Sequence, residues 1–342
     1  MDDRQGRRAA IDARGVEVTY SDGTEAVRGI DLEVPEGEFF GFLGPNGAGK
    51  TTTIKTFATL LAPTGGEITV NGFDVERDAR KVRETIGYMA QETSVDLELT
   101  ARENVRFAAQ AYGVPRSERA DRIDELLELV DLADVAEKQA DEFSGGMKKR
   151  LDVATALVHD PPLVFLDEPT TGLDPKARNR LWEYFQRIND EGTTLFLTTQ
   201  YLEEADQLCD RISVILDGEI VAEGSPMELK RQVGGEILDV ELDDPDDRER
   251  AAEIARESGV FDGDADVGVS DDGVTVTAER ARQHGTDLLV ALRDADVTVT
   301  GFNIRAPTLD DVFLAITGEE PDLDRNGAAS EAADATSEVS AE

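Results

Sequence analysis

The sequence predicts an α/β protein built on a parallel sheet and followed by a smaller α+β domain. Three observations predict this fold class. The first is the segment Gly44-Pro45-Asn46-Gly47-Ala48-Gly49-Lys50-Thr51, which fits G-x-x-x-x-G-K-[ST] between an apolar strand and a helix. The second is the apolar run Leu163–Glu168, which is typical of a buried parallel strand and ends in two carboxylates. The third is a β-α-β-β-α-β pattern that begins at Glu236.

The hairpin that precedes the glycine-rich segment carries a candidate binding residue. Residues 11–20 and 26–34 alternate apolar and polar side chains around a turn, which predicts a β-hairpin after a mixed-charge tail over residues 1–10. Tyr20 lies at the hairpin tip, where its ring can stack on a nucleobase. The pattern alone is equally consistent with an ordinary strand tyrosine.

The segment Gly44–Thr51 predicts a phosphate-binding loop. Its glycines let successive backbone N–H groups turn toward an anion, and the dipole of the following helix adds roughly half a positive charge. Lys50 is expected to reach the β- and γ-phosphates, and the Thr51 hydroxyl is expected to bind Mg²⁺. A glycine-rich turn without a ligand would leave the Lys-Thr pair unexplained.

The region after the loop changes from strands to helices. Residues 67–73 predict a strand that enters an Asn-Gly turn, and residues 85–90 predict a strand that delivers Gln91 to the edge of the nucleotide pocket. From about residue 92 to residue 143 the apolar spacing is helical, which predicts a helical subdomain. The first of its helices has apolar residues at Val105, Phe107, Ala108, Ala111 and Tyr112.

A second glycine-containing helix start follows at Phe143–Leu151. Ser144 is the expected N-cap, and Gly145 and Gly146 in the first turn expose backbone N–H groups that favour an anion. A helix start with no such purpose would not favour two destabilising glycines. We therefore expect a second anion site here.

Two carboxylates are placed at the end of the apolar strand. Asp167 is expected to hold Mg²⁺ beside the phosphate loop, and Glu168 is expected to orient or activate water. Asp174 is the expected N-cap of the next helix, with proline at its first position. Residues 193–198 predict another strand, which ends just before Gln200.

The composition shifts at Glu236, after which 29 acidic and 8 basic residues remain. We expect an accessory domain over residues 236–318 and a disordered acidic tail over residues 319–342. The expected elements of the domain are a strand at 236–242, a helix at 246–258, strands at 265–269 and 273–278, a helix at 281–293 and a strand at 296–304.

The chain is strongly acidic, with a formal net charge of −39 over 342 residues. This charge disfavours nucleic acid as a partner, and none is expected. At molar ionic strength the screening length falls to about 3 Å, so a dense acidic surface becomes tolerable. We expect a salt-adapted host, and the absence of lysine after Lys230 fits that expectation.

Cysteine usage and hydropathy indicate the cellular environment expected for the protein. The single Cys209 excludes an internal disulfide framework and fits a reducing environment. No charged-then-apolar leader opens the chain, and no apolar run reaches the roughly 18 residues of a membrane span. We therefore expect a chain that is soluble by itself.

Together, these motifs resemble the ATP-binding subunit of an ABC transporter over roughly residues 11–235. The matches are Gly44–Thr51 to the Walker A motif, Gln91 to the Q-loop, Ser144–Met147 to the signature motif, Leu163–Glu168 to the Walker B strand, Gly172–Asp174 to the D-loop and Tyr20 to the adenine-stacking aromatic residue. The resemblance implies a P-loop NTPase fold of the ABC type. Such a fold has a RecA-like core, an antiparallel β subdomain and a helical subdomain, and here a ferredoxin-like C-terminal module would follow.

The resemblance also implies ATP and Mg²⁺ as cofactors and a second ATP-binding subunit, most simply a homodimer. The signature motif of one subunit would close over the ATP held by the other. The implied nucleotide contacts are Tyr20, Gly44, Pro45, Asn46, Gly47, Ala48, Gly49, Lys50, Thr51, Thr52, Ser144, Gly145, Gly146 and Asp174. The implied Mg²⁺ ligands are Thr51, Gln91 and Asp167, and the implied catalytic residues are Glu168, Lys50, Gln200 and Gln91.

Two positions depart from the family pattern. Met147 stands where the signature usually has glutamine, and Gln200 stands where the switch residue is usually histidine. An amide can hydrogen-bond a γ-phosphate but cannot carry the charge of an imidazolium, so Glu168 is expected to bear more of the water positioning.

Residues 197–208 and 307–314 are similar to the daunorubicin-resistance type of ABC exporter ATPase. That similarity implies a separate integral-membrane permease, export of a hydrophobic compound, and a peripheral location on the cytoplasmic face of the membrane. Two alternatives remain. A soluble ABC-type ATPase of DNA repair or translation usually carries tandem cassettes or long coiled coils, and a phosphotransferase would leave the Ser-Gly-Gly helix start unexplained.

Overall fold

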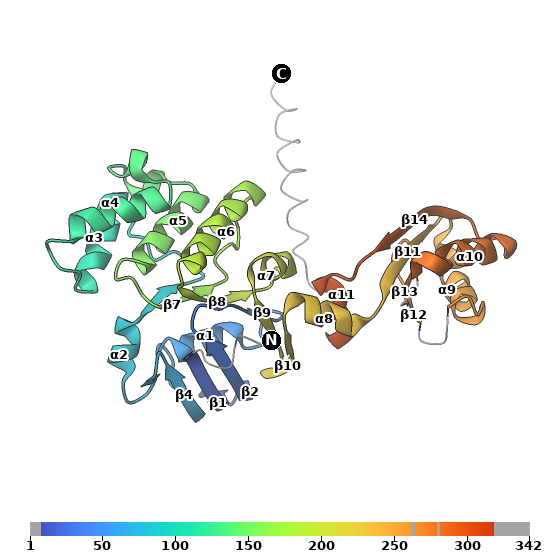
Figure 1. Ribbon diagram of the computed structural model, residues 1–342, viewed down its shortest axis with the longest axis horizontal. Coiled ribbons are helices and arrows are strands. Elements are labelled where there is room, and N and C mark those ends of the chain that lie inside the picture. Colours follow the sequence, from blue (N-terminus) through green and yellow to red (C-terminus); the bar gives the residue numbers. More distant parts are fainter. Residues whose placement is uncertain (1–7, 262–264, 279–280, 318–342) are drawn as a thin grey trace, which may run out of the picture. The chain divides into compact units, whose positions relative to one another are not determined.

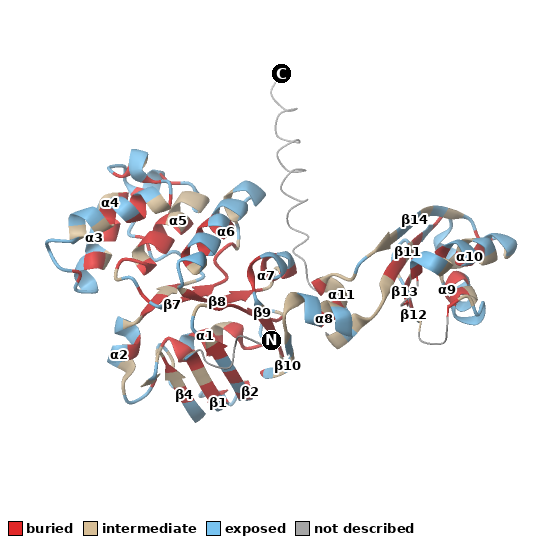
Figure 2. Ribbon diagram, viewed as in Figure 1, coloured by how far each residue is buried: buried red, intermediate tan, exposed pale blue. Residues whose placement is uncertain are grey.

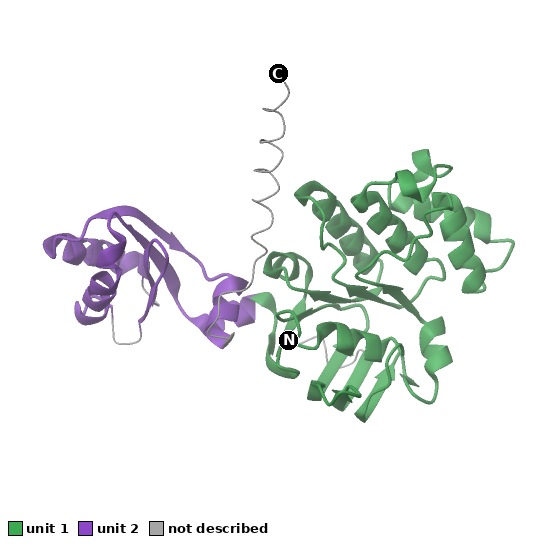
Figure 3. Ribbon diagram, turned by 180° about the vertical axis from the view of Figure 1, so that it is seen from behind, with its two compact units in different colours: residues 1–226 green, residues 227–342 purple. Residues whose placement is uncertain are grey.

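The computed structural model describes residues 8–261, 265–278 and 281–317. The chain divides into two compact units between Pro226 and Met227 (Figure 3). The sequence pattern placed this boundary nine residues later, after residue 235. The expected acidic tail over residues 319–342 lies outside the described residues. Of the expected N-terminal tail, Ala9 and Ala10 already belong to the first strand.

A six-stranded sheet with the order β10-β9-β3-β8-β7-β6 is the centre of the first unit (Figure 1). The strands from β9 to β6 are parallel, and β10 is antiparallel. Because parallel strands end at one edge, the segments that follow β3, β6, β7 and β8 meet there. The bounds are β3 Phe39–Leu43, β6 Ile86–Met89, β7 Leu163–Asp167, β8 Thr194–Thr199, β9 Arg211–Leu216 and β10 Glu219–Gly224.

A second, antiparallel sheet has the order β2-β1-β4-β5. Helix α1 (Lys50–Phe57) lies between the two sheets, because Ile54 and Phe57 share one apolar core with Val16 and Phe196. Figure 2 shows this core as buried on both sides of the helix. The bounds are β1 Ala9–Thr19, β2 Glu25–Pro35, β4 Gly65–Val70 and β5 Phe73–Asp74.

Helices α5 (Gly145–Ala156), α6 (Pro175–Asp190) and α7 (Leu202–Leu208) cover the other face of the central sheet (Figure 1). Helices α3 (Ala101–Ala111) and α4 (Arg119–Leu129) pack on α5, and short 3₁₀ turns follow at Ala133–Val135 and Ala140–Glu142. Helix α2 (Ala79–Glu84) lies on the α1 side, where Val82 belongs to the core that α1 shares with the antiparallel sheet. Helix α3 begins at a capping box formed by Thr100 and Glu103. Because α5 packs on α3 and α4, the helical layer continues beyond residue 143.

The buried face of α3 differs from the face that the apolar spacing indicated. Ala101, Asn104, Val105 and Ala109 are buried, whereas Phe107 is 68% exposed. The buried face is made by small side chains and one amide, so the largest apolar residue points to solvent. Hydrophobicity alone therefore does not identify the buried face of this helix.

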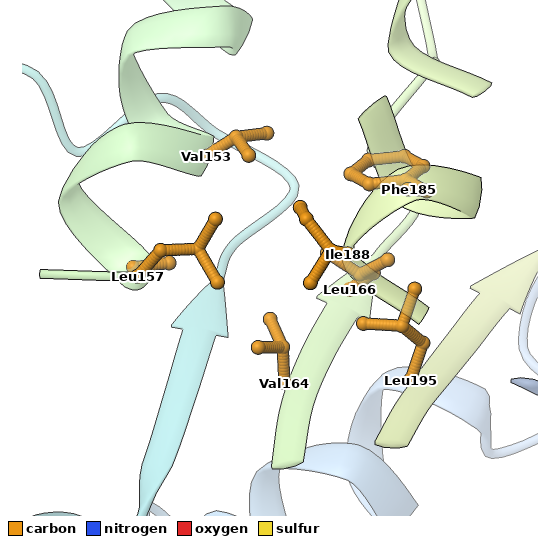
Figure 4. Close-up of a pocket in the computed structure, with 8 residues that line it drawn as sticks. Val153, Leu157, Val164, Leu166, Phe185, Ile188 and Leu195 are labelled. Carbon is orange, nitrogen blue, oxygen red and sulfur yellow. The ribbon is translucent and has the colours of Figure 1, made fainter. Parts of the chain in front are cut away.

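A small apolar void lies between α5, α6 and the central sheet (Figure 4). Its volume is about 10 Å³, which is close to the minimum that holds one water molecule. Its lining consists of Val153, Ala156, Leu157, Val164, Leu166, Phe185, Ile188 and Leu195. The void is a packing gap with no room for a ligand.

The second unit contains a four-stranded sheet with the order β12-β13-β11-β14, and all its strand pairs are antiparallel. This order confirms the predicted β-α-β-β-α-β fold. The strands are β11 Glu236–Leu242, β12 Asp266–Val269, β13 Gly273–Ala278 and β14 Val299–Arg305. The helices are α8 Pro226–Val233, α9 Arg248–Glu257, α10 Ala281–Asp294 and α11 Leu309–Thr317, with a 3₁₀ turn at Pro245–Asp247.

A charged clamp holds the start of α11. The two terminal nitrogens of Arg305 lie 2.6 and 2.9 Å from the Asp311 carboxylate oxygens, and Arg305 Nε lies 2.9 Å from Asp239 Oδ2. Leu309, Val312 and Phe313 of this helix are buried. Within the described ranges, no helix is both long enough and apolar enough to cross a bilayer.

Candidate nucleotide-binding site

An open pocket of about 320 Å³ lies over the N-terminus of α1, at the edge where the parallel strands end. Its lining comes from three places: the β1–β2 hairpin, the glycine-rich loop with α1, and the segments after β6 and β7. The residues are Tyr20, Thr24, Glu25, Ala26, Asn46, Gly47, Gly49, Lys50, Thr51, Thr52, Gln91 and Glu168. Gly44, Pro45 and Ala48 belong to the same loop but do not line the pocket.

The loop before α1 has its shape because glycine occupies two crowded positions. Gly49 has φ +109°, and a Cβ there would lie 2.4 Å from the carbonyl oxygen of Ala26. A Cβ on Gly44 would lie 2.3 Å from the carbonyl oxygen of Ile215. Among the described residues, no side chain caps α1 and its first turn holds no acid. Its N–H groups are therefore available to an anion.

Lys50 is turned into the site and is only 4% exposed. Its Nζ donates to the carbonyl oxygens of Gly44 at 2.8 Å and Pro45 at 3.1 Å, and it lies 3.4 Å from Glu168 Oε1. Burial lowers the pKa of Lys50, while the Glu168 charge opposes that shift. The buried charge of the lysine is thus satisfied by oxygen atoms of its own chain.

Glu168 is engaged through both carboxylate oxygens. Oε1 faces Lys50, and Oε2 accepts a 2.9 Å hydrogen bond from Gln91 Nε2. The residue has a left-handed backbone with φ +46°, and its N–H donates to the carbonyl oxygen of Thr198 at 3.0 Å. Such a conformation in a residue with a side chain costs free energy and is often found at functional sites.

Thr51 and Asp167 are brought together beside this pair. Thr51 Oγ1 donates to Asp167 Oδ1 at 3.2 Å, and Thr198 Oγ1 donates to the same oxygen at 2.7 Å. Tyr88 lies 3.5 Å from Asp167 Oδ2, and its burial together with that charge raises the pKa of the phenol. Hydroxyl and carboxylate oxygens are the donors that Mg²⁺ prefers, so this set fits the ion.

The described part of the chain contains no group of three or more His, Cys, Asp or Glu side chains placed to hold a metal. A magnesium site here would therefore depend on phosphate oxygens as well as on protein oxygens. That dependence is typical of Mg²⁺ bound together with a nucleotide.

Tyr20 lies at the rim of the pocket with its side chain 41% exposed. Its hydroxyl is 2.9 Å from Thr52 Oγ1, which anchors the hairpin tip to α1. Thr24, Glu25 and Ala26 also line the pocket, and the sequence analysis missed them. Their position directly after the Tyr20 turn was the one available signal.

The second predicted anion site lies outside this pocket. Ser144 Oγ accepts a hydrogen bond from Met147 N at 3.3 Å, and a Cβ on Gly146 would lie 2.9 Å from Ala177 Cβ. Asp174 Oδ1 accepts from Ala177 N at 2.9 Å. The start of α5 therefore packs against the start of α6, but neither start lines the pocket.

Gln200 directly follows β8, is half-buried and is not one of the residues that line the pocket. Close to it in sequence, Glu204 is fully buried and its Oε1 accepts a 2.9 Å hydrogen bond from Trp182 Nε1. Burial raises the pKa of Glu204. The guanidinium of Arg178 lies over the rings of Trp182 and Tyr201, at 5.9 and 5.5 Å from their centroids.

Comparison with known proteins supplies the family. The ABC transporter family matches residues 27–171, and the family described as ATP-binding protein DrrA1-3-like, C-terminal domain, matches residues 224–317. The chain is 42% identical over 318 residues to the daunorubicin/doxorubicin resistance ATP-binding protein DrrA of Streptomyces peucetius, covering 92% of this chain and 94% of that protein. It is 35% identical over 308 residues to the linearmycin resistance ATP-binding protein LnrL of Bacillus subtilis, covering 90% and 98%.

Solved structures match the first part of the fold. An ATP-binding subunit of an ABC transporter superposes with a TM-score of 0.60 at 31% identity, covering 66% of this chain and 93% of its own. A dimeric ATP-binding cassette with bound ADP and phosphate superposes with a TM-score of 0.58 at 28% identity, covering 63% and 98%. Motifs, fold and relatives agree, and the chain belongs to the ATP-binding subunits of ABC transporters, within the daunorubicin-resistance group.

Proposed function

We propose that this ABC ATPase powers the export of a hydrophobic, drug-like or lipid-like compound through a separate membrane permease. One observation carries the proposal. The solved cassettes cover about two thirds of the chain, whereas DrrA and LnrL match it across the C-terminal unit as well. Both of those relatives are named for resistance to a drug. The chain would act at the cytoplasmic face of the membrane, with a permease that contains the pore.

Different residues of the pocket would bind different parts of the nucleotide. Tyr20 stacks on adenine, and the N–H groups of Gly44–Thr51 bind the phosphates. ATP offers Lys50 γ-phosphate oxygens in place of the Gly44 and Pro45 carbonyls, which are its present partners. The lysine that now faces Glu168 is then directed toward the phosphate.

Thr51, Asp167 and Gln91 would hold Mg²⁺. When bound, this ion neutralises charge on the β- and γ-phosphate oxygens. With Lys50 bound to phosphate and Gln91 among the residues that would hold Mg²⁺, both oxygens of Glu168 would lose their present partners. Glu168 can then accept a hydrogen bond from the attacking water and align it with the γ-phosphate. Gln200 contributes a neutral hydrogen bond to the same phosphate.

The two helix starts that lie outside the pocket support a composite site. Ser144, Gly145, Gly146 and Asp174 of a second subunit would contact the nucleotide held by the first, in a two-fold symmetric homodimer. Closure of that dimer on ATP would be coupled to movement of the permease. We also propose a salt-adapted host, on the basis of the net charge of −39.

Co-expression with the permease tests the transport role. A candidate permease is a neighbouring gene product with about six apolar spans. The chain is expected in the membrane fraction when both are expressed, and ATP turnover by the complex is expected to rise with the exported compound. If the chain instead purifies with ribosomes or DNA and does not co-purify with the permease, it is a soluble ATPase of DNA repair or translation.

A further inference from the structure

The segment that carries Gln91 is tied to the helical layer by buried charged side chains. This segment, residues 91–99, follows β6 and is mostly exposed. Its contacts are with α5, the helix that begins at the signature motif, and with α3. Lys149 and Asp152 of α5 are 8% and 2% exposed, respectively, although both carry ionisable groups.

Lys149 holds the backbone of the segment at Gln91. Its Nζ donates to the carbonyl oxygen of Gln91 and, at 3.5 Å, to that of Ala90. A buried ammonium group is costly unless its donors are used, so this position is maintained by those carbonyls. The same Gln91 reaches Glu168 with its side chain at 2.9 Å.

Asp152 lies three residues further along α5, on the same face of the helix. It accepts three hydrogen bonds: from Ser94 N at 3.0 Å, from Ser94 Oγ at 2.6 Å and from Thr93 Oγ1 at 2.5 Å. From α3, Asn104 Oδ1 accepts from Asp96 N at 2.9 Å, and Asn104 Nδ2 donates to Asp96 O at 2.9 Å. Beyond β6, Ala90, Gln91, Thr93, Ser94 and Asp96 are thus bound to side chains of the helices α5 and α3.

We propose that Lys149 and Asp152 are positioning residues that fix residues 91–94 to the signature helix. A change at the γ-phosphate that moves Gln91 then moves the N-terminus of α5, and the reverse also holds. This couples the pocket of one subunit to the signature motif that the same subunit offers to its partner. The inference rests on the proposed roles of Gln91 and Ser144–Gly146.

Kinetics of purified variants provide the first test. In Lys149→Met and Asp152→Ala, kcat for ATP is expected to fall about tenfold or more, because a displaced Gln91 no longer sets the position of Glu168. KM is expected to stay within about threefold, because the phosphate loop and Tyr20 are untouched. The double variant is expected to be no worse than the poorer single variant, since both act on one element.

Two controls separate positioning from general damage. Lys148→Met removes the neighbouring lysine, whose side chain makes no hydrogen bond or ion pair with the described residues, and it is expected to keep wild-type kinetics. Asp152→Asn keeps an acceptor oxygen for Ser94 and is expected to restore most of the kcat lost in Asp152→Ala.

Hydrogen exchange supplies a readout independent of turnover. In Asp152→Ala the Ser94 amide is expected to exchange faster, whereas the Asp96 amide, held by Asn104, stays protected. If either α5 variant fails to fold, Ser94→Ala and Thr93→Val remove the contacts from the exposed side and are expected to lower kcat as well.

Wild-type kcat in Lys149→Met, Asp152→Ala and Ser94→Ala would overturn the inference. So would unchanged exchange at the Ser94 amide. Failure of the proposed function would look different, because Glu168→Gln would then hydrolyse ATP normally whatever the α5 variants do.

Discussion

Two helices of this chain, α1 and α5, have glycine at their N-termini and no acidic side chain in the first turn, but only α5 has a side-chain cap. Helix α1 starts at Gly49 with no side-chain cap, and its N-terminus faces the pocket of its own chain. Helix α5 starts at Ser144, whose hydroxyl caps Met147 N, and lies outside that pocket. Under the composite-site proposal, the uncapped start of α1 leaves its N–H groups open to the nucleotide of its own pocket, whereas Ser144 satisfies an N–H group of α5 when no partner subunit is bound.

The largest effect is expected at Glu168, in the pocket over the N-terminus of α1, because this residue is proposed to position the attacking water. Glu168→Gln is expected to lower ATP turnover about 10³-fold, because the amide cannot accept the water proton, while ATP binding is retained and closed dimers accumulate. Turnover and size-exclusion profiles with ATP provide the measurement. Glu183→Gln, an exposed carboxylate on α6, is the matched control. Near-normal hydrolysis by Glu168→Gln would remove this residue from the role.

Equivalent glycine substitutions at the two helix starts separate binding from turnover. Gly49→Ala adds a Cβ at φ +109° and 2.4 Å from the Ala26 carbonyl oxygen, so ATP affinity is expected to fall about 100-fold. In Gly145→Ala the nearest atom to the new Cβ, a methyl carbon of Leu173, is 3.9 Å away, so the fold is expected to be unharmed. Helix propensity predicts a gain of up to about 1 kcal/mol in stability for that variant.

Despite that stability, Gly145→Ala is expected to lower kcat about tenfold, because the methyl group keeps the partner's γ-phosphate from the backbone. ATP binding to the isolated subunit is expected to be unchanged. Calorimetric ATP titration and steady-state turnover of both variants are the measurements. Weakened ATP binding by Gly145→Ala would place both helix starts in one subunit's pocket and contradict the comparison.

A smaller effect is expected at the switch position. Gln200→Ala is expected to lower kcat less than about tenfold, since a neutral hydrogen bond to phosphate contributes little beside Lys50 and Glu168. Steady-state ATP turnover measures it, with Gln200→His as the companion variant. A loss as large as that of Glu168→Gln would make Gln200 a principal catalytic group.

Salt is expected to change stability by the smallest amount per residue, and this effect is distributed over both units. Raising KCl from about 0.1 to 1 M shortens the screening length from about 10 to 3 Å, which weakens repulsion within a chain of net charge −39. The melting temperature by circular dichroism is expected to rise across that range, with NaCl as the comparison salt. A melting temperature independent of salt would contradict the salt-adapted host.

Much of the fold could be predicted from the sequence, because local motifs report it directly. The apolar strand before Lys50 and the one before Asp167 indicated the parallel sheet, and the alternating pattern after Glu236 indicated the ferredoxin-like order. The structure also brings Lys50 and Gln91 into contact with Glu168, as expected for strand ends at one edge.

Other parts of the site have no local pattern. The partners of Lys149 and Asp152 lie 58 or 59 residues earlier in the chain, so no local pattern indicates these contacts. Only tertiary packing reveals which charge is buried and what it contacts. The exposure of Phe107 has the same cause, since α3 is oriented by its neighbours rather than by its largest apolar side chain.

The hydrogen bond between Trp182 and Glu204 gives the protein a built-in optical probe. Trp182 is the chain's one tryptophan, and its N–H is bound to a carboxyl group on α7, the helix that follows Gln200. Helix α6 begins at the D-loop, so this bond spans two segments that nucleotide is expected to move. Indole emission responds to its hydrogen bonding and surroundings, so ATP binding and dimer closure can be followed in the unlabelled protein.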